Sequence, residues 1–301
     1  MSDPIAIRLL EGRAEFSAAE DVQRAAWMMP DDNELVPAHL LQALQWHGGI
    51  VLGAFAPDGK VVGATFGFVG LTHDDTQIAQ LGGNVLFCSH MLGVVPAYQG
   101  QSIGYRLKLA QREHALKQGH RLIVWTYDPM QSANARLNVG KLRGICRRYI
   151  PDAYGELKEG VNVGMPSDRF ELEWWIASQR VEKHLENPPS PPSLPAWRAA
   201  GVQLINPSTP RPDGLRAPNE QPASPDSETI LVEIPGSVAA LRAADMGLVR
   251  AWRFHTREVI QAAFDRGYFV ADVTDEDAEE TRRSFYLLQH DPGCKNFFEE
   301  M

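Results

Sequence analysis

Short apolar runs and helical apolar spacings follow one another along the chain and predict its elements. Apolar runs of about four to eight residues are typical of strands, and apolar residues three or four apart are typical of helices. Over the first 187 residues the order is strand, two helices, three strands, helix, strand, helix, two strands and helix. The expected elements are 5–10, 17–28, 36–47, 50–55, 61–69, 85–95, 103–118, 121–127, 132–142, 145–149, 170–176 and 177–186.

Local signals set several of these boundaries. Ser17 and Glu20 have the spacing of a capping box, so the first helix is expected to begin there. Residues 56–60 are expected to form a hairpin turn, and residues 72–83 a polar loop. Gly119 is placed to end the helix that begins near residue 103.

Prolines mark a break in the second half of the chain. The stretch 188–225 holds 11 of the 21 prolines and few apolar residues. It is expected to be an extended linker or surface loop. The domains expected are therefore 1–187, a proline-rich linker at 188–227, and an α+β extension at 228–301 that packs on the first domain or extends its sheet.

Composition narrows the class of protein. The chain has 301 residues, is 44% hydrophobic and carries a net charge of −9. These values are typical of a globular protein, and the acidic balance disfavours nucleic-acid partners and membrane surfaces. Three widely spaced cysteines show no metal-ligand spacing, and no basic-then-apolar leader or membrane span is evident. A cytoplasmic protein without a metal is expected.

The stretch that organises the chain joins the strand 85–95 to the following helix. Small residues stand at positions 100, 102 and 104, directly before and within the first turn of that helix. Such a loop lets backbone N–H groups point at one spot beside the positive end of the helix dipole. The pattern predicts an anion site suited to phosphate, although an ordinary strand–turn–helix connection has the same outline.

The spacing in this loop resembles the pyrophosphate motif [QR]-x-x-G-x-[GA] of the GNAT acyltransferase superfamily. Gln99, Ser102 and Gly104 fall on the three defined positions, with serine in place of the usual glycine. The order of elements over residues 5–176 is also the order of the GNAT fold. The stretch 132–142 resembles the helix that follows the fifth strand in this superfamily. The stretches 125–129 and 164–170 resemble a thinly characterised bacterial subgroup with an extended C-terminus.

The resemblance implies a fold class and a co-substrate. The fold would be α/β (α+β), with a central mixed, mostly antiparallel sheet flanked by helices. Acetyl-CoA or another acyl-CoA would bind through its pyrophosphate to the loop, while backbone N–H groups near the end of the preceding strand would hold the thioester carbonyl. The coenzyme-binding residues implied are Gly93, Val94, Gln99, Gly100, Gln101, Ser102, Ile103, Gly104, Asn134 and Lys141.

The acid and base of the reaction stay open at this point. Ser89 stands where the family often has a glutamate base, and a serine cannot act as one. A water chain at Ser89, or the neighbouring His90, is the alternative. Asn138 replaces a common tyrosine acid, and Tyr127 and Tyr149 are alternatives for it. Each of these residues could equally be structural.

Three charged residues are candidates for the acceptor site. Asp128 follows a strand that is apolar on both faces, and Asp168 and Arg169 follow a turn-like stretch. Arg169 could bind an acceptor's carboxylate through its bidentate fork, with Asp168 binding the ammonium group. The competing interpretation is a surface ion pair between them.

Two classes of function are compatible with these residues. The first is a CoA-dependent N-acyltransferase that acts on the amine of a small molecule such as an amino acid. The second is a non-catalytic acyl-CoA-binding or regulatory module, suggested by Ser89 and Asn138. A homodimer is compatible with either class.

Overall fold

The structure is a computed structural model that describes residues 5–29, 34–155, 164–188, 193–277 and 282–299. The chain forms two compact units. The first runs to Trp125 and includes Trp175–Ala177. The second comprises Thr126–Glu156, Met165–Trp174 and Ser178–Met301.

The first unit is built on a mixed sheet whose strand order is β1-β2-β3-β4-β5. Neighbouring strands are antiparallel, except that β4 and β5 are parallel. Apolar side chains fill both faces of β2 and most of β3, which places them in the core. The strands are β1 (Ala6–Leu9), β2 (Ile50–Phe55), β3 (Val61–Leu71), β4 (Val85–Val94) and β5 (Ile123–Tyr127).

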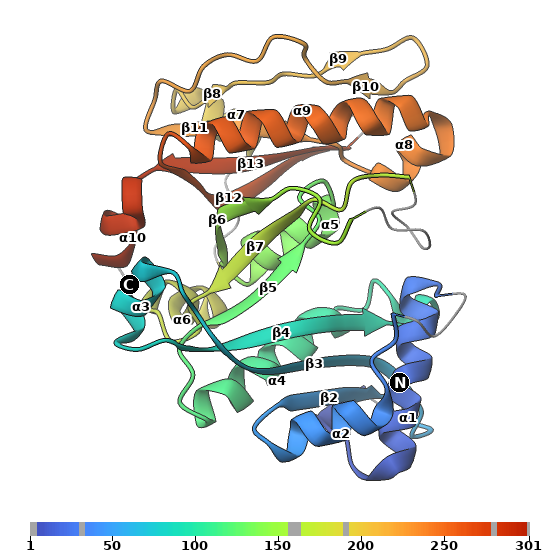
Figure 1. Cartoon of the computed structure of the whole chain (residues 1–301). Coiled ribbons are helices and arrows are strands. Elements are labelled where there is room, and N and C mark those ends of the chain that lie inside the picture. The colour runs from blue at the N-terminus through green and yellow to red at the C-terminus, as the bar shows by residue number, and fades with distance from the viewer. Residues whose placement is uncertain (1–4, 30–33, 156–163, 189–192, 278–281, 300–301) are drawn as a thin grey trace. The chain divides into compact units, whose positions relative to one another are not determined.

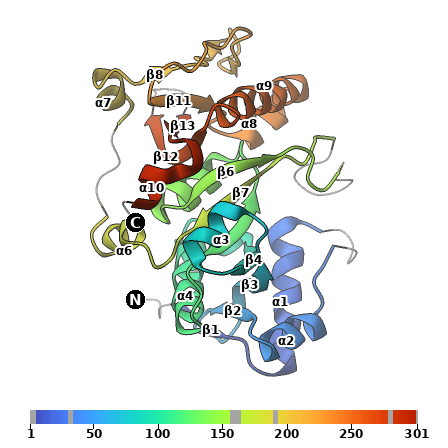
Figure 2. The same ribbon diagram turned by 60° about the vertical axis from the view of Figure 1, so that its left-hand side comes forward.

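Helices cover both faces of this sheet (Figures 1 and 2). On one face, α1 packs on β3 and β4 while α2 packs on β2 and β3. On the other face, α4 packs on β2, β3 and β4 and so brings its first turn to the end of β4. The helices are α1 (Gly12–Trp27), α2 (Ala38–Trp46), α3 (Asp75–Leu81) and α4 (Ile103–Lys117), with a 3-10 turn at Pro96–Tyr98.

Two predictions in this unit were wrong, namely the start of the first helix and the loop at 72–83. The first helix begins at Gly12 and not at Ser17, because the Glu15 carboxylate accepts a hydrogen bond from the Glu11 N–H (2.7 Å) and pairs with Arg8. That carboxylate caps the first turn in the way that a capping box at Ser17 was expected to do.

The predicted polar loop at 72–83 also contains a helix, α3. The Asp74 side chain accepts a hydrogen bond from the Gln77 N–H, and Gly82 ends the helix in the left-handed region with φ of 67°. Both are ordinary helix signals at the correct spacing. The polar composition of the stretch concealed them.

The strands of the second unit pair in the order β7-β6-β12-β13-β11-β8. Cys146 of β6 pairs with Val270 of β12, so the C-terminal strands share a sheet with β6 and β7. The strands are β6 (Ile145–Ile150), β7 (Arg169–Trp174), β8 (Gln203–Leu204), β11 (Thr229–Ile234), β12 (Tyr268–Asp277) and β13 (Arg282–His290), and β9 (Thr209–Pro210) pairs separately with β10 (Arg216–Ala217).

The long helix α9 lies along these strands (Figure 1). Its buried face contains Leu248, Trp252, Val259 and Ala263, which recur at helical spacing. The predicted helix at 132–142 is divided into a short α-helix and a π-helix. The helical segments are α5 (Ser132–Ala135), the π-helix Arg136–Lys141, α6 (Gln179–Glu186), α7 (Leu194–Ala199), α8 (Val238–Ala244), α9 (Met246–Phe264), the 3-10 turn Pro292–Cys294 and α10 (Lys295–Glu299).

The proline-rich stretch contains short elements where its residues are described. Leu194 of α7 is buried against Leu231, Phe285 and Leu287. Farther along, the Ser208 N–H and hydroxyl both donate to the buried Glu233 carboxylate. An apolar contact at Leu194 and hydrogen bonds at Ser208 therefore hold a segment whose average composition predicted an extended chain. The predicted domain boundaries at 187 and 227 stay a prediction.

The predicted fold class is confirmed. Element by element, the order over residues 6–174 matches the predicted one, with α3 as the addition. Mixed, mostly antiparallel sheets flanked by helices form the framework of the chain. Among the described residues, no helix has both the length and the apolar composition needed to cross a membrane.

Candidate functional site

The glycine loop lies at the surface of the first unit, between β4 and α4. Gly100 and Ser102 both have left-handed backbones, with φ of 79° and 58°. The Gln99 side chain folds back and donates a hydrogen bond to the Val94 carbonyl (3.0 Å), which ties the loop to the end of the strand. The loop is thus fixed at the strand end and turns sharply into the first turn of α4.

Ser102 keeps the backbone conformation that glycine would adopt more easily. A left-handed non-glycine residue costs about 1–3 kcal/mol, and such strain is found most often at functional sites. The Ser102 side chain makes no cap hydrogen bond to α4. Helix geometry leaves the first N–H groups of α4 without intrahelical acceptors, so they are donors available to an anion.

Parallel pairing between β4 and β5 is short. The registered pairs are Phe87 with Ile123 and Cys88 with Val124, and no further pair occurs between the described residues of these two strands. From Ser89 onward, β4 pairs with β3 alone. The backbone of β4 toward Gly93 and Val94 therefore has an edge that β5 does not occupy.

Gly93 allows α1 to approach that part of β4 closely. A Cβ atom at Gly93 would lie 2.8 Å from the Ala26 Cβ atom and 2.9 Å from the Trp27 ring. A larger residue would push α1 away from the strand. Close packing on the α1 side thus fixes the position of the Gly93 and Val94 backbone.

His90 is the extra residue of a β-bulge. Phe66 is paired with Met91 and Gly67 with Ser89, so His90 has no partner on β3. Its ring lies edge-on to the Phe66 ring, with the centroids 5.5 Å apart. Partial burial lowers the pKa of the imidazole, which favours its neutral form. Bulges of this kind re-aim side chains beside active sites.

Ser89 contacts a residue that sequence reasoning missed. The Lys108 ammonium nitrogen lies 2.7 Å from the Ser89 hydroxyl oxygen and 3.5 Å from the centre of the Trp125 ring. Lys108 is only 3% exposed, and burial lowers the pKa of its amine well below the ordinary value. In the sequence, Lys108 directly follows Leu107 and falls within the stripe of α4 that faces the core, and this position is what could have indicated a buried lysine.

In the second unit, Asp128 is engaged in a buried ion pair. Arg253 of α9 donates to both carboxylate oxygens, at 2.8 and 2.6 Å. The Met130 N–H donates to one of the same oxygens. These contacts give the Asp128 carboxylate a structural role. A role for Asp128 in binding substrate stays a prediction.

Asp168 is held in the same way by another arginine of α9. Arg257 donates to both of its oxygens, and the Tyr149 hydroxyl donates to one of them at 2.6 Å. Hydrogen bonds from Arg257 and Tyr149 outweigh burial and lower the pKa of the carboxyl. Burial raises the pKa of Tyr149, so its hydroxyl stays protonated. The structure therefore brings Asp128, Tyr149 and Asp168 together around α9.

The other residues predicted in this unit are more dispersed. Tyr127 is buried, with its hydroxyl 3.3 Å from that of Tyr286, and burial raises its pKa well above the ordinary value. Arg169 donates to the Asp168 carbonyl, and its guanidinium carbon lies 5.2 Å from the centre of the Tyr154 ring. Asn134 and Lys141 are exposed on α5 and at the end of the π-helix.

The arginines that follow Lys141 are paired with carboxylates of the sheet. Arg143 lies 2.7 Å from Asp272 and Arg147 lies 2.6 Å from Glu173. Both carboxylates belong to strands of the second unit, so these two arginines have partners within the protein. Within the described ranges, no group of three or more histidine, cysteine or acidic side chains could hold a metal ion.

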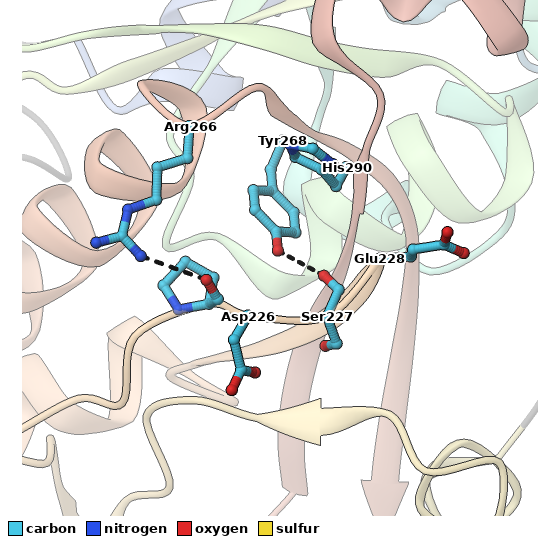
Figure 3. A pocket seen from close by; sticks show the side chains of 7 residues that line it. Asp226, Ser227, Glu228, Arg266, Tyr268 and His290 are labelled. Carbon is cyan, nitrogen blue, oxygen red and sulfur yellow. Dashed lines mark hydrogen bonds between the residues drawn. The ribbon is translucent and has the colours of Figure 1, made fainter.

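One hollow of the second unit, of about 330 Å³, lies where the proline-rich stretch reaches β11 (Figure 3). The Tyr268 hydroxyl donates to the Ser227 carbonyl and Arg266 donates to the Pro225 carbonyl. Two of the polar side chains drawn there, Tyr268 and Arg266, therefore hold the proline-rich stretch (Figure 3). We interpret it as the anchor of that segment and assign it no chemistry.

The order of elements, the loop at the end of β4 and the early end of β4–β5 pairing decide the fold. The chain has the GNAT fold. No protein-family model matches the sequence, and no curated protein matches it. Several solved structures resemble this GNAT fold over somewhat more than half of the chain, at low sequence identity.

Three of these structures illustrate the likeness, and two of them are named as N-acetyltransferases. NAA60 of Arabidopsis thaliana in complex with a bisubstrate analogue is 16% identical and covers 57% of this chain and 97% of its own, with a TM-score of 0.45. The ribosomal-protein-S18-alanine N-acetyltransferase of Escherichia coli is 16% identical over 57% and 94%, with a TM-score of 0.42. Arylalkylamine N-acetyltransferase 2 of Aedes aegypti is 13% identical over 56% and 98%, with a TM-score of 0.41.

Proposed function

We propose that the protein is a CoA-dependent N-acyltransferase that moves an acyl group from acyl-CoA to the amine of a small molecule. The observation that carries the proposal is the loop at the start of α4. It combines two left-handed residues, Gly100 and Ser102, with the free N–H groups of a helix of 15 residues. A pyrophosphate would be held by these N–H groups and by the helix dipole.

The end of β4 supports a second requirement of the reaction, which is a hydrogen-bond donor to the thioester carbonyl. Acyl transfer from a thioester requires a donor at the position where the carbonyl oxygen gains charge. Because the registered pairs with β5 end at Cys88, the backbone near Gly93 and Val94 has room for such a partner. The close packing of Gly93 on α1 would hold that donor in place, as preorganised stabilisation requires.

The substrate class, an amine that also carries a carboxylate, rests on Arg169. Its guanidinium has no ion-pair partner among the described residues, whereas Arg253 and Arg257 are each paired with a buried carboxylate. An amino acid needs a cation at its carboxylate, and the net charge of −9 makes a local cation more important. A cytoplasmic location and a homodimer stay predictions.

The Arg169→Met variant should lose about ten- to hundred-fold in kcat/KM for an amino-acid acceptor such as alanine. A charge-assisted bidentate pair contributes about 1.5–3 kcal/mol, which corresponds to that factor. The loss should be much smaller for ethylamine, which is alanine without its carboxylate. Equal losses on both acceptors would assign Arg169 a structural role and remove the support for amino acids.

A non-catalytic acyl-CoA-binding module is the second candidate function. The observation that favours it is the absence of carboxylate and tyrosine at positions 89 and 138, which are serine and asparagine. Release of free thiol from acetyl-CoA in the presence of a panel of primary amines separates the two functions. We expect amine-dependent release by the wild-type protein. Acetyl-CoA binding without release for any amine would favour the binding module.

A further inference from the structure

The side chain of Lys108 reaches the point where β4 and β5 separate. The last registered pair of the two strands is Cys88 with Val124. Ser89 and Trp125 are the next residues on each strand, and the Lys108 amine touches both. The amine therefore lies where the pairing of the two strands ends, directly beside Ser89.

The surroundings of this amine are unusual for a lysine. Its hydrogen-bond partners are the Ser89 hydroxyl at 2.7 Å and the Gln111 side-chain oxygen at 3.3 Å, both neutral groups. No ion pair of Lys108 occurs among the described residues, although Lys and Arg are almost never fully buried unless paired. Burial lowers the pKa of Lys108 and favours its neutral amine, and the electrostatic effect of Cys88 and the Trp125 ring offset only part of that preference.

A second buried group in the same place lacks a partner. The Gln111 side-chain nitrogen is buried and donates no hydrogen bond within the described parts of the chain. An unpaired buried donor is costly, and it is satisfied where a water molecule or a ligand oxygen can reach it. Lys108, Ser89 and Gln111 thus form a polar group with capacity for one more partner, in a region otherwise filled by apolar side chains.

We propose that Ser89 and Lys108 form a proton relay that prepares the acceptor amine, in place of the missing carboxylate base. The inference rests on the proposed N-acyltransferase function. Ser89 would take a proton from the acceptor's ammonium group, directly or through one water molecule, and pass its own hydroxyl proton to the neutral Lys108 amine. In this scheme Lys108 is a positioning residue that acts through Ser89.

The remaining steps balance without another reactant. The neutral amine attacks the thioester carbon, a C–N bond forms and the C–S bond breaks. The nitrogen releases its second proton as the amide forms, and the coenzyme thiolate takes that proton to leave as a thiol. Lys108 then returns its proton to solvent when the products leave. The net change is one amide, one thiol and one proton released from one ammonium and one thioester.

Burial of Ser89 favours a relay over a nucleophile. A nucleophilic serine must touch the thioester carbon, whereas a proton can cross one bridging water molecule. Ser89 is only 3% exposed, and its hydroxyl oxygen accepts a hydrogen bond from the Lys108 amine. An acetyl group attached to Ser89 during turnover would overturn this choice, and mass spectrometry of the protein quenched with acetyl-CoA would reveal it.

The test compares two acceptors of similar size that differ in their need for a base. Ethylamine is an ammonium ion at neutral pH, whereas 2,2,2-trifluoroethylamine is largely neutral there. With acetyl-CoA as donor, Lys108→Met and Ser89→Ala should each lower kcat/KM for ethylamine by about 10²–10⁴-fold, the usual contribution of general base catalysis. The losses for trifluoroethylamine should be less than about five-fold, because that amine needs no base.

The pH profile gives a second readout that a structural role would not move. The deficit of each variant on ethylamine should shrink as the pH rises, because the acceptor then loses its proton in solution. Lys117→Met is the matched control, since Lys117 is an exposed lysine of the same helix, and it should leave kcat/KM unchanged on both amines. Ser89→Ala decides the question if Lys108→Met does not fold.

The other outcomes of this experiment would contradict the proton relay of Ser89 and Lys108. Equal losses on both amines would assign Lys108 and Ser89 to packing alone, and unchanged kcat/KM would remove them from the reaction. In both cases the wild-type protein still acylates amines, so the proposed function stands. Wild-type protein that binds acetyl-CoA and acylates no amine would overturn the proposed function, and the relay with it.

Discussion

Gly104→Glu should abolish the binding of acetyl-CoA by a protein that still folds. A carboxylate in the first turn of α4 would face the pyrophosphate. One such pair at about 4 Å costs roughly 4 kcal/mol at an effective dielectric constant near 20, or nearly a thousand-fold in affinity. Folding should be retained, because an acidic residue in the first turn favours the helix dipole. Calorimetric titration with acetyl-CoA measures the loss.

The matched control for this variant is Gly104→Gln, which has the same shape without the charge. A Cβ atom at residue 104 would meet only the Leu92 side chain, at 3.3 Å, so both variants should have the same small steric cost. We expect the glutamine variant to bind more weakly than wild type and far more tightly than the glutamate variant. Equal affinities of the two variants would exclude charge repulsion, and wild-type affinity for the glutamate variant would place the coenzyme elsewhere.

The sequence predicted those features of the fold that depend on nearby residues. Apolar spacing located β2, β4 and α4 to within a few residues, because each element repeats a short apolar pattern. Gly119 ends α4 as expected, with a left-handed backbone and a hydrogen bond from the His120 N–H to the Ala115 carbonyl. Short-range rules also explain the errors, since the Glu15 carboxylate caps α1 from inside the helix.

The features that the sequence did not predict depend on residues far apart. Arg253 and Asp128 are 125 positions apart, and neither side chain indicates the other. Arg257 and Asp168 are 89 apart, so the sequence suggested a pair between the adjacent Asp168 and Arg169 instead. Composition also cannot show that single residues such as Leu194 and Ser208 anchor a proline-rich segment.

The residues of the candidate site divide in the same way, into those predicted from nearby residues and those that depend on distant ones. The loop from Gln99 to Gly104 could be found because its function depends on backbone shape, which small residues at fixed spacing report. The acid and base could not be found, because a strand residue meets its partner only when a helix packs on the sheet. Ser89 alone indicated a missing base. The contact between Ser89 and Lys108 suggests which groups act in place of that base.

Lys108→Met should make the protein more stable while it lowers the rate of acyl transfer. Burial disfavours the charged amine, so each unit by which the pKa falls costs the native state about 1.4 kcal/mol relative to the unfolded chain at a pH below the native pKa. Methionine fills a similar volume without a charge. We expect the free energy of unfolding to rise at neutral pH, as residues retained for function often cost stability.

The pH dependence of stability shows whether the native amine is neutral. The folded pKa of Lys108 is lowered and the unfolded pKa is the ordinary lysine value, so between the two the unfolded chain binds one more proton. The free energy of unfolding of the wild-type protein should therefore rise with pH across that window and lose this slope below the folded pKa. In Lys108→Met the contribution is absent, so its advantage over wild type should shrink as the pH rises.

Urea denaturation of both proteins from about pH 7 to pH 9.5 measures this difference below the ordinary range of tyrosine. Subtraction of the two curves removes every other titrating group that the proteins share. Lys117→Met should parallel wild type at each pH, because an exposed lysine contributes little to stability. A constant difference between Lys108→Met and wild type across this range would mean that the native amine is charged. The relay would then lack its proton acceptor, even if the loop of Gly100 and Ser102 binds acetyl-CoA as proposed.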